Sequence, residues 1–131
     1  MKQKVSDYIA DHIAEWGIRD VFTVTGGGAM HMNDAFGHHP KLHCNYQHHE
    51  QACAMAAEAY ARLGNKMAAV CVTTGPGATN AITGVLGAWM DSIPMLVLSG
   101  QVRYDTTVRH SGLKIRTMGV QEYDITPSVE P

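Results

Sequence analysis

One carboxylate stands at the start of an alanine-rich segment of this chain. Glu50 directly precedes residues 51–62, which are dominated by Ala with Met, Glu and Arg, and these residue types favour a helix. A carboxylate in the first helical turn interacts favourably with free backbone N–H groups and with the helix dipole. Two interpretations are open. Glu50 either caps the helix or supplies a carboxylate to a site, and the choice depends on what else the chain brings there.

Two glycine-rich turns each follow a short apolar run. Residues 26–28 are three consecutive glycines after the β-rich residues 21–24, and the sequence TGPGATN at 74–80 follows the apolar residues 67–73. Glycine permits positive φ angles and close approach of another molecule to the backbone. The second turn does not fit G-x-G-x-x-G, because Asn80 stands at the last glycine position, and no Gly-Lys-Ser/Thr follows. The first turn is either a ligand-facing loop or a plain strand-to-helix turn.

Eight histidines and three cysteines raise the question of a metal site or a nucleophile. No H-E-x-x-H or Cys-x-x-Cys spacing occurs, and third and fourth ligands cannot be named. There is no G-x-S-x-G, and no cysteine falls in a strand-to-helix turn. We therefore expect neither a protein-only metal site nor a serine or cysteine hydrolase. An odd number of dispersed cysteines argues against a disulfide framework and for a reducing cytoplasm.

Length and composition indicate one globular domain. The chain has 131 residues, of which 45% are hydrophobic, and its formal net charge is -2. No basic patch suggests nucleic acid, and no apolar run has the length of a signal peptide or membrane span. We expect a cytoplasmic domain without a nucleic-acid or membrane partner.

Strand-like and helix-like patterns alternate along the chain. Helices are expected at 5–16, 29–36, 50–63 and 81–89, and strands at 21–24, 42–46, 67–73 and 95–99. This order predicts an α/β fold with a mostly parallel sheet, helices on both faces and right-handed crossovers. Ligands of such sheets bind beyond the carboxyl ends of the strands. Both glycine turns, Glu50 and Gln101 follow strands, so we expect them along one edge of the sheet.

Finer features of these elements can also be predicted. Ser6 is expected to cap the first helix and Gly17 to end it. The polar, basic residues 102–119 are expected to form a long loop with little regular structure. The central helix should be buried and should end at residues 64–65, and its small residues should let another element pack closely. Its apolar side chains recur at helical spacing at Ala52, Met55, Ala56, Ala59 and Tyr60.

Several spaced segments, in this order, resemble the N-terminal pyrimidine-binding domain of thiamine diphosphate (ThDP) enzymes, most closely the acetolactate synthase-like branch. The matching segments are 49–51, 56–62, 74–80, 91–94 and 100–102. The similarity extends from residue 5 to about residue 125, and it is specific for the superfamily but not for one substrate. It implies the three-layer α/β/α ThDP-binding fold and a domain at 1–131 that is truncated at its C-terminal end.

The resemblance implies roles for individual residues. Glu50 is similar to the glutamate that hydrogen-bonds N1′ of the aminopyrimidine and so promotes deprotonation of the thiazolium, which attacks the carbonyl of a 2-oxo acid. Pro76 and Asn80 match positions that line the pyrimidine, and Gln121 matches a glutamine that approaches substrate. The turn that approaches the thiazolium and substrate of the partner site is matched by Gly26, Gly27 and Gly28.

The family's Gly-Asp-Gly…Asn motif, which binds the diphosphate through Mg²⁺, is absent from this chain. We therefore expect Mg²⁺ to be bound by another domain of the same or a partner chain, within a homo-oligomer, and the chain alone to be inactive. FAD in a full-length protein is allowed by the resemblance but supported by no residue here. Thr25 replaces a frequent Pro and Val120 a frequent Phe, which favours a 2-oxo acid or related carbonyl compound other than that of acetolactate synthesis.

Two alternatives stay open. The chain could be a small pyrimidine-binding subunit of a two-subunit ThDP decarboxylase, or a non-catalytic α/β binding module that kept the fold and lost the reaction. Retention of Glu50 argues against the second alternative.

Overall fold

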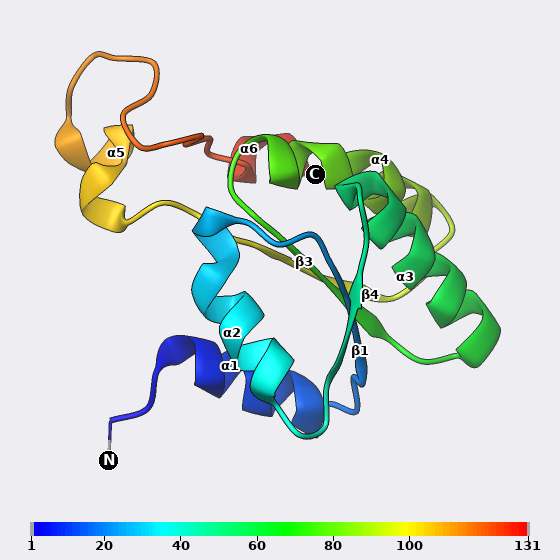
Figure 1. Cartoon of the computed structure of the whole chain (residues 1–131). Helices are drawn as coiled ribbons and strands as arrows, with labels where there is room; N and C mark the ends of the chain where they lie inside the picture. Colours follow the sequence, from blue (N-terminus) through cyan, green and yellow to red (C-terminus); the bar gives the residue numbers. More distant parts are fainter. Residues whose placement is uncertain (1, 131) are drawn as a thin grey trace.

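A four-stranded, fully parallel sheet organises the computed structural model, which describes residues 2–130 (Figure 1). The strands are β1 (Asp20–Thr23), β2 (His43–Tyr46), β3 (Ala68–Val72) and β4 (Met95–Ser99), in the spatial order β2-β1-β3-β4. Phe22 of β1 lies opposite Asn45 in β2 and Val70 in β3. The predicted parallel sheet is confirmed, and the carboxyl ends of all four strands lie at one edge.

Two pairs of helices cover the two faces of the sheet (Figure 1). One face carries α1 (Val5–Glu15) and α2 (Met30–His38), and the other carries α3 (Glu50–Gly64) and α4 (Pro76–Met90). Neighbouring residues of β1 point to opposite cores: Val21 packs with α1 and α2, and Phe22 with α3 and α4. Every residue of β3 is buried, as expected for a strand covered on both faces. This is the predicted three-layer α/β/α arrangement.

The predicted close packing of the central helix α3 is confirmed, whereas the apolar positions named for it are only partly correct: Ala56 and Tyr60 pack against the core, but the other three do not. The buried residues are Cys53, Ala54, Ala57 and Ala61, whereas Ala52, Met55 and Ala59 are exposed. A Cβ added at Gly84 of α4 would lie only 2.5 Å from Cβ of Ala54. The smallest residues therefore face α4 and the sheet, because they allow the closest approach of the helix axes. The larger apolar side chains that suggested the other face are left partly in solvent.

Two helix starts also differ from expectation. Lys4 is the N-cap residue of α1 and makes no side-chain cap bond, while Ser6 is buried inside the helix, so the predicted Ser6 cap is wrong. The α4 helix begins at Pro76, five residues before the predicted start. Proline suits the first helical position, because its φ is already helical and its missing N–H would have no partner there. The predicted end of α3 is confirmed, with Asn65 in the left-handed conformation.

Short helical turns flank the main elements. The turn η1 (Gly27–Ala29) leads into α2, and α6 (Thr126–Val129) lies near the C-terminus. The expected long loop at 102–119 contains η2 (Tyr104–Thr106) and α5 (Val108–Ser111) and projects from the body (Figure 1). Among residues 2–130, every helix is too short or too polar to cross a lipid bilayer.

Candidate active site

Glu50 begins α3 but does not cap it. The capping acceptor is Nδ1 of His49, which receives the backbone N–H of Gln51 at 3.1 Å. The half-buried carboxylate of Glu50 turns instead toward α4, where its Oε2 accepts a hydrogen bond from Nδ2 of Asn80 at 3.0 Å. The structure thus brings together two of the predicted site residues, and the cap interpretation of Glu50 does not describe the geometry.

Gly77 lies next to this carboxylate and packs closely on Thr73. A Cβ at position 77 would lie 2.7 Å from Cγ2 of Thr73 and 3.5 Å from Oε1 of Glu50. Within residues 2–130, Oε1 of Glu50 accepts no hydrogen bond, so this oxygen is available to a donor of a bound molecule. Pro76, the other predicted pyrimidine-lining residue, is exposed at the first position of α4.

Thr73, directly after β3, lies between the first glycine turn and the start of α4. Its Oγ1 accepts the backbone N–H of Gly28 at 3.0 Å. A Cβ at Gly26 would lie 2.4 Å from Cβ of Thr73, whereas a Cβ at Gly27 would meet nothing within 4 Å. Gly26 is thus required by close packing on Thr73, while the fold places no such demand on Gly27. The sequence analysis missed Thr73, and the only signal for it was its position just before the second glycine turn.

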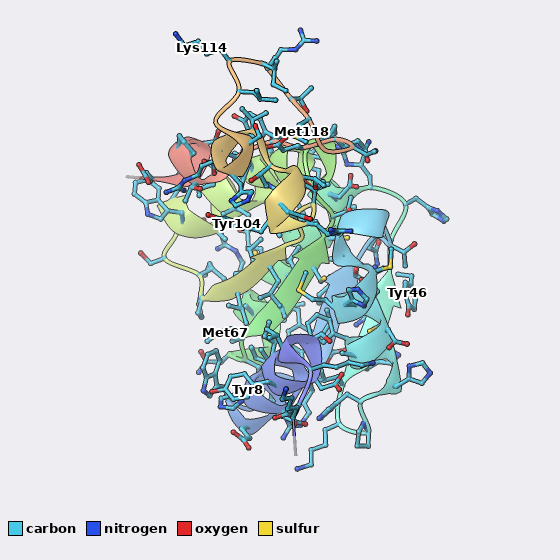
Figure 2. All side chains as sticks on the ribbon, turned by 90° about the vertical axis from the view of Figure 1, so that its left-hand side faces the viewer. Tyr8, Tyr46, Met67, Tyr104, Lys114 and Met118 are labelled. Atoms are coloured by element: carbon cyan, nitrogen blue, oxygen red, sulfur yellow. The ribbon has the colours of Figure 1, made fainter. Side chains whose placement is uncertain are left out.

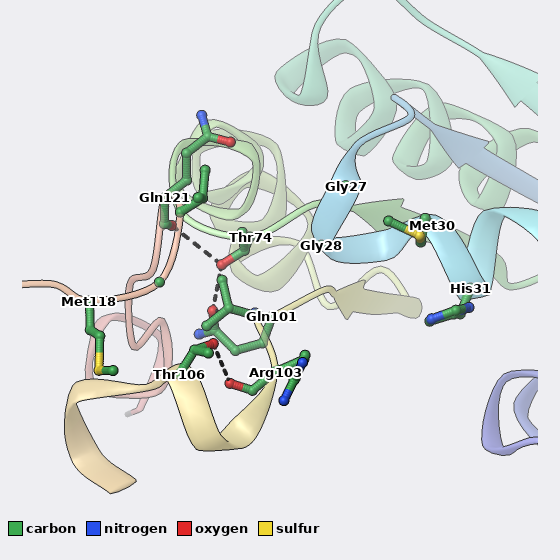
Figure 3. A pocket seen from close by; sticks show the side chains of 13 residues that line it. Gly27, Gly28, Met30, His31, Thr74, Gln101, Arg103, Thr106, Met118 and Gln121 are labelled. Atoms are coloured by element: carbon green, nitrogen blue, oxygen red, sulfur yellow. Dashed lines mark hydrogen bonds between the residues drawn. The ribbon is translucent and has the colours of Figure 1, made fainter. Parts of the chain in front are cut away.

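Gly27 and Gly28 also line an open cavity of about 610 Å³ (Figure 3). One side of the cavity carries these glycines with Met30 and His31, and the opposite side carries Thr106, Met118 and Gln121. Gln101 and Thr74 lie between the two sides. Of the predicted residues, Gly27, Gly28 and Gln121 line the cavity, whereas Gly26, Glu50, Pro76 and Asn80 do not. Thr73 lies between the two groups, because it binds Gly28 and packs on Gly26 and on Gly77 of α4.

Thr74 lines this cavity and begins a short chain of hydrogen bonds to Gln101 and Tyr123. It is 4% exposed, and its Oγ1 donates to Oε1 of Gln101 at 2.6 Å. Nε2 of Gln101 in turn donates to the backbone carbonyl of Tyr123 at 2.7 Å. Gly75 has a φ of +60°, and a Cβ there would lie 2.1 Å from the carbonyl oxygen of Gln121. The second glycine turn is therefore shaped to receive the returning chain at 121–123.

The buried thiols are poor candidates for nucleophiles. Burial, with a smaller contribution from the charge of Glu50, raises the pKa of Cys53 to about 11. Burial also raises the pKa of Cys71 to about 12. Since the thiolate is the reactive form, both groups remain protonated and unreactive near neutral pH. Among residues 2–130, no cluster of three or more His, Cys, Asp or Glu side chains is arranged to hold a metal ion.

These features belong to a recognised class of domain. The chain is a member of the family described as thiamine pyrophosphate enzyme, N-terminal TPP binding domain, whose model matches residues 3–123. The resemblance inferred from the sequence motifs is thereby confirmed.

Several similar curated proteins are acetolactate synthases. The chain is 34% identical over 128 residues to acetolactate synthase 2, chloroplastic, of Zea mays, covering 98% of this chain and 18% of that protein. It is 48% identical over 86 residues to the acetolactate synthase large subunit of Buchnera aphidicola subsp. Schizaphis graminum, covering 66% and 15%. For the Lactococcus lactis large subunit the identity is 38% over 97 residues, covering 74% and 17%. The chain thus spans less than a fifth of the length of these relatives.

Proposed function

We propose that this chain is the pyrimidine-binding part of a ThDP-dependent enzyme that acts on a 2-oxo acid, as an acetolactate synthase-like carboligase or decarboxylase. The observation that carries the proposal is the state of Glu50. His49 and not Glu50 caps the helix, Asn80 binds Oε2 of Glu50, and Oε1 accepts no hydrogen bond from residues 2–130. A carboxylate arranged in this way is suited to a ligand donor rather than to holding the fold.

The residues present fit the pyrimidine half of ThDP. When bound, ThDP supplies an acidic thiazolium C–H and an electron sink for making and breaking carbon–carbon bonds. Glu50 would accept a charge-assisted hydrogen bond from N1′ and exchange a proton at that atom. Asn80 orients the carboxylate, and Gly77 lets the start of α4 pack closely on Thr73 beside it. Pro76 would line the pyrimidine beside them.

The cavity that includes Gly27, Gly28 and Gln121 would face the reacting carbonyl compound. We propose that Mg²⁺ and the diphosphate are held by another domain of the same or a partner chain, in a homo-oligomer. Residues 1–131 would then supply one half of a shared site in a longer protein. The free thiols of Cys44, Cys53 and Cys71 suit a reducing compartment, and we propose the cytoplasm. No described residue supports a role for FAD.

Product analysis would test the proposal. The full-length protein, supplied with ThDP, Mg²⁺ and a panel of 2-oxo acids, is expected to release CO₂ and to yield an aldehyde or a 2-hydroxy ketone detectable by mass spectrometry. The Glu50→Gln protein, run in parallel, should yield neither. A small pyrimidine-binding subunit would need addition of its partner subunit before products form. A non-catalytic module would give no product under any of these conditions, with or without the substitution of Glu50.

A further inference from the structure

Glu122 ties together the two ends of the projecting segment at 108–118. Its Oε1 accepts the backbone N–H of Val108 at 2.7 Å, and its Oε2 accepts those of Met118 at 3.0 Å and Gly119 at 3.2 Å. Val108 is the first residue of α5 and of the segment, Met118 is the last residue of the segment, and Gly119 follows it. One side chain therefore closes the base of the segment. Hydrogen bonds from backbone N–H groups to an ionised carboxylate are among the stronger ones in proteins.

At its start the segment is held by the Thr107 cap of α5 and by the ring of His110, whose centroid lies 4.6 Å from that of Tyr104. The residues after α5 have few other contacts. Leu113, Ile115 and Met118 are all about half exposed, and none belongs to either apolar core. Figure 2 shows Lys114 at the far tip, with Met118 closer to the body. A segment with few buried apolar contacts opens at low free energy unless specific bonds retain it. The bonds to Glu122 are therefore expected to dominate its position.

The residues that Glu122 holds form one wall of the cavity. Met118, Gly119, Val120 and Gln121 all line it, and they directly precede Glu122. Gln121 has a φ of +59°, an uncommon value for a side-chain-bearing residue. Its carbonyl oxygen packs closely on Gly75, where an added Cβ would lie 2.1 Å away, and lies 3.4 Å from Oγ1 of Thr74 (Figure 3). The body therefore fixes one side of Gln121, and the next residue, Glu122, makes the three backbone hydrogen bonds that together form a clamp.

We infer that Glu122 is a positioning residue, whose carboxylate holds the cavity wall and the unusual backbone of Gln121 in place by binding the amides of Val108, Met118 and Gly119. The part of this inference that concerns substrate rests on the proposed function, because it takes the cavity as the substrate side of the site. The clamp itself rests only on the hydrogen bonds and is tested without any cofactor.

The clamp is tested by hydrogen–deuterium exchange of the full-length protein, measured on peptides that cover residues 106–120. In Glu122→Ala all three amides lose their acceptor, and their exchange should accelerate at least about tenfold. Glu122→Gln has a single acceptor oxygen and cannot serve both ends, so exchange should accelerate at one end or both. Glu130→Gln removes an exposed carboxylate that makes no hydrogen bond to the segment, and serves as the control. Unchanged exchange in Glu122→Ala, or in Glu122→Gln if the alanine variant does not fold, overturns the clamp.

The effect on substrate is tested separately on the same proteins. Loss of the clamp should lower kcat/KM for the 2-oxo acid about tenfold to a hundredfold, mainly through KM, while C2–H exchange of bound ThDP stays at the wild-type rate. Loosened amides with an unchanged kcat/KM would reduce Glu122 to a structural role and overturn the positioning role. If Glu50→Gln fails to slow C2–H exchange, the proposed function fails instead, and the amide exchange still decides the clamp.

Discussion

Thr73 and Gly28 join the two groups of site residues: Oγ1 of Thr73 accepts the backbone N–H of Gly28 at 3.0 Å. The Cβ and methyl of Thr73 occupy the space that side chains at Gly26 and Gly77 would need. The residue after β3 thus sets the distance between the turn that borders the cavity and the helix that faces Glu50. Its hydroxyl and its methyl have different tasks, so they can be tested one at a time.

We expect Thr73→Val and Thr73→Ser to lower stability for different reasons. Valine keeps the shape but leaves the half-buried N–H of Gly28 without an acceptor, which costs about 1–3 kcal/mol in the free energy of unfolding. Serine keeps the acceptor and loses only a methyl group, which costs about 1 kcal/mol. Urea unfolding of both variants measures the difference. Equal stability of the valine variant and the wild type would show that the hydroxyl does not hold the turn.

The glycine turn offers a second matched pair. In Gly26→Ala the new Cβ would meet Thr73 at 2.4 Å, so we expect a loss of about 1–3 kcal/mol in stability. Gly27→Ala meets nothing within 4 Å and should fold with wild-type stability. If Gly27 faces the ligand, its alanine variant should nevertheless raise KM for the substrate in the full-length protein. A fully active Gly27→Ala enzyme would leave Gly27 as an ordinary residue of a strand-to-helix turn.

The contact of α3 with α4 predicts that two glycine-to-alanine substitutions in α4 change stability in opposite directions. Alanine is favoured over glycine in a helix by about 1 kcal/mol. At Gly87 the nearest atom to a new Cβ is Oε2 of Glu58 at 3.4 Å, so Gly87→Ala should stabilise by up to that amount. At Gly84 the new Cβ would meet Ala54 at 2.5 Å, and Gly84→Ala should destabilise by about 1–3 kcal/mol. Thermal unfolding of the two variants checks both signs, and stabilisation by Gly84→Ala would contradict the packing described here.

The same contact shows how far sequence reasoning reaches. The parallel sheet followed from local signals, namely β-rich runs such as residues 67–73 that end in glycine turns, and these also placed Glu50 and Gln101 at the carboxyl edge. The buried face of α3 could not be predicted in this way. The apolar periodicity around Met55 is compatible with several rotations of the helix about its axis. The close approach of Gly84 to Ala54, thirty residues earlier, selects one of these rotations.

Interactions between distant residues account for the rest of what was missed. The bond from Asn80 to Glu50 depends on the relative rotation of two helices, and the bond from Gly28 to Thr73 depends on the order of strands β1 and β3. Capping by His49 was missed for a different reason. Histidine is not among the preferred capping residues, so the sequence suggested the adjacent carboxylate of Glu50 as the cap instead.

The role of Glu50 can be separated from helix capping by three substitutions. In Glu50→Gln the side chain can still accept the hydrogen bond from Asn80, and the His49 cap is intact, so the melting temperature should hardly change. An amide cannot exchange a proton with N1′ as a carboxylate does. Since general acid–base catalysis contributes roughly 100- to 10,000-fold, C2–H exchange of bound ThDP in the full-length protein should slow by about two to four orders of magnitude.

One control for this experiment is the N-cap residue of α3, and the other lies on that helix. His49→Ala removes the cap and should lower stability by about 1 kcal/mol without a comparable loss of C2–H exchange. Glu58→Gln, two turns further on, weakens the exposed ion pair with Arg62, worth less than about 1 kcal/mol, and should leave C2–H exchange near the wild-type rate. Stability should therefore fall most in the His49 variant, and proton exchange only in the Glu50 variant. Equal C2–H exchange rates for the wild type and Glu50→Gln would end the assignment of Glu50 to the cofactor.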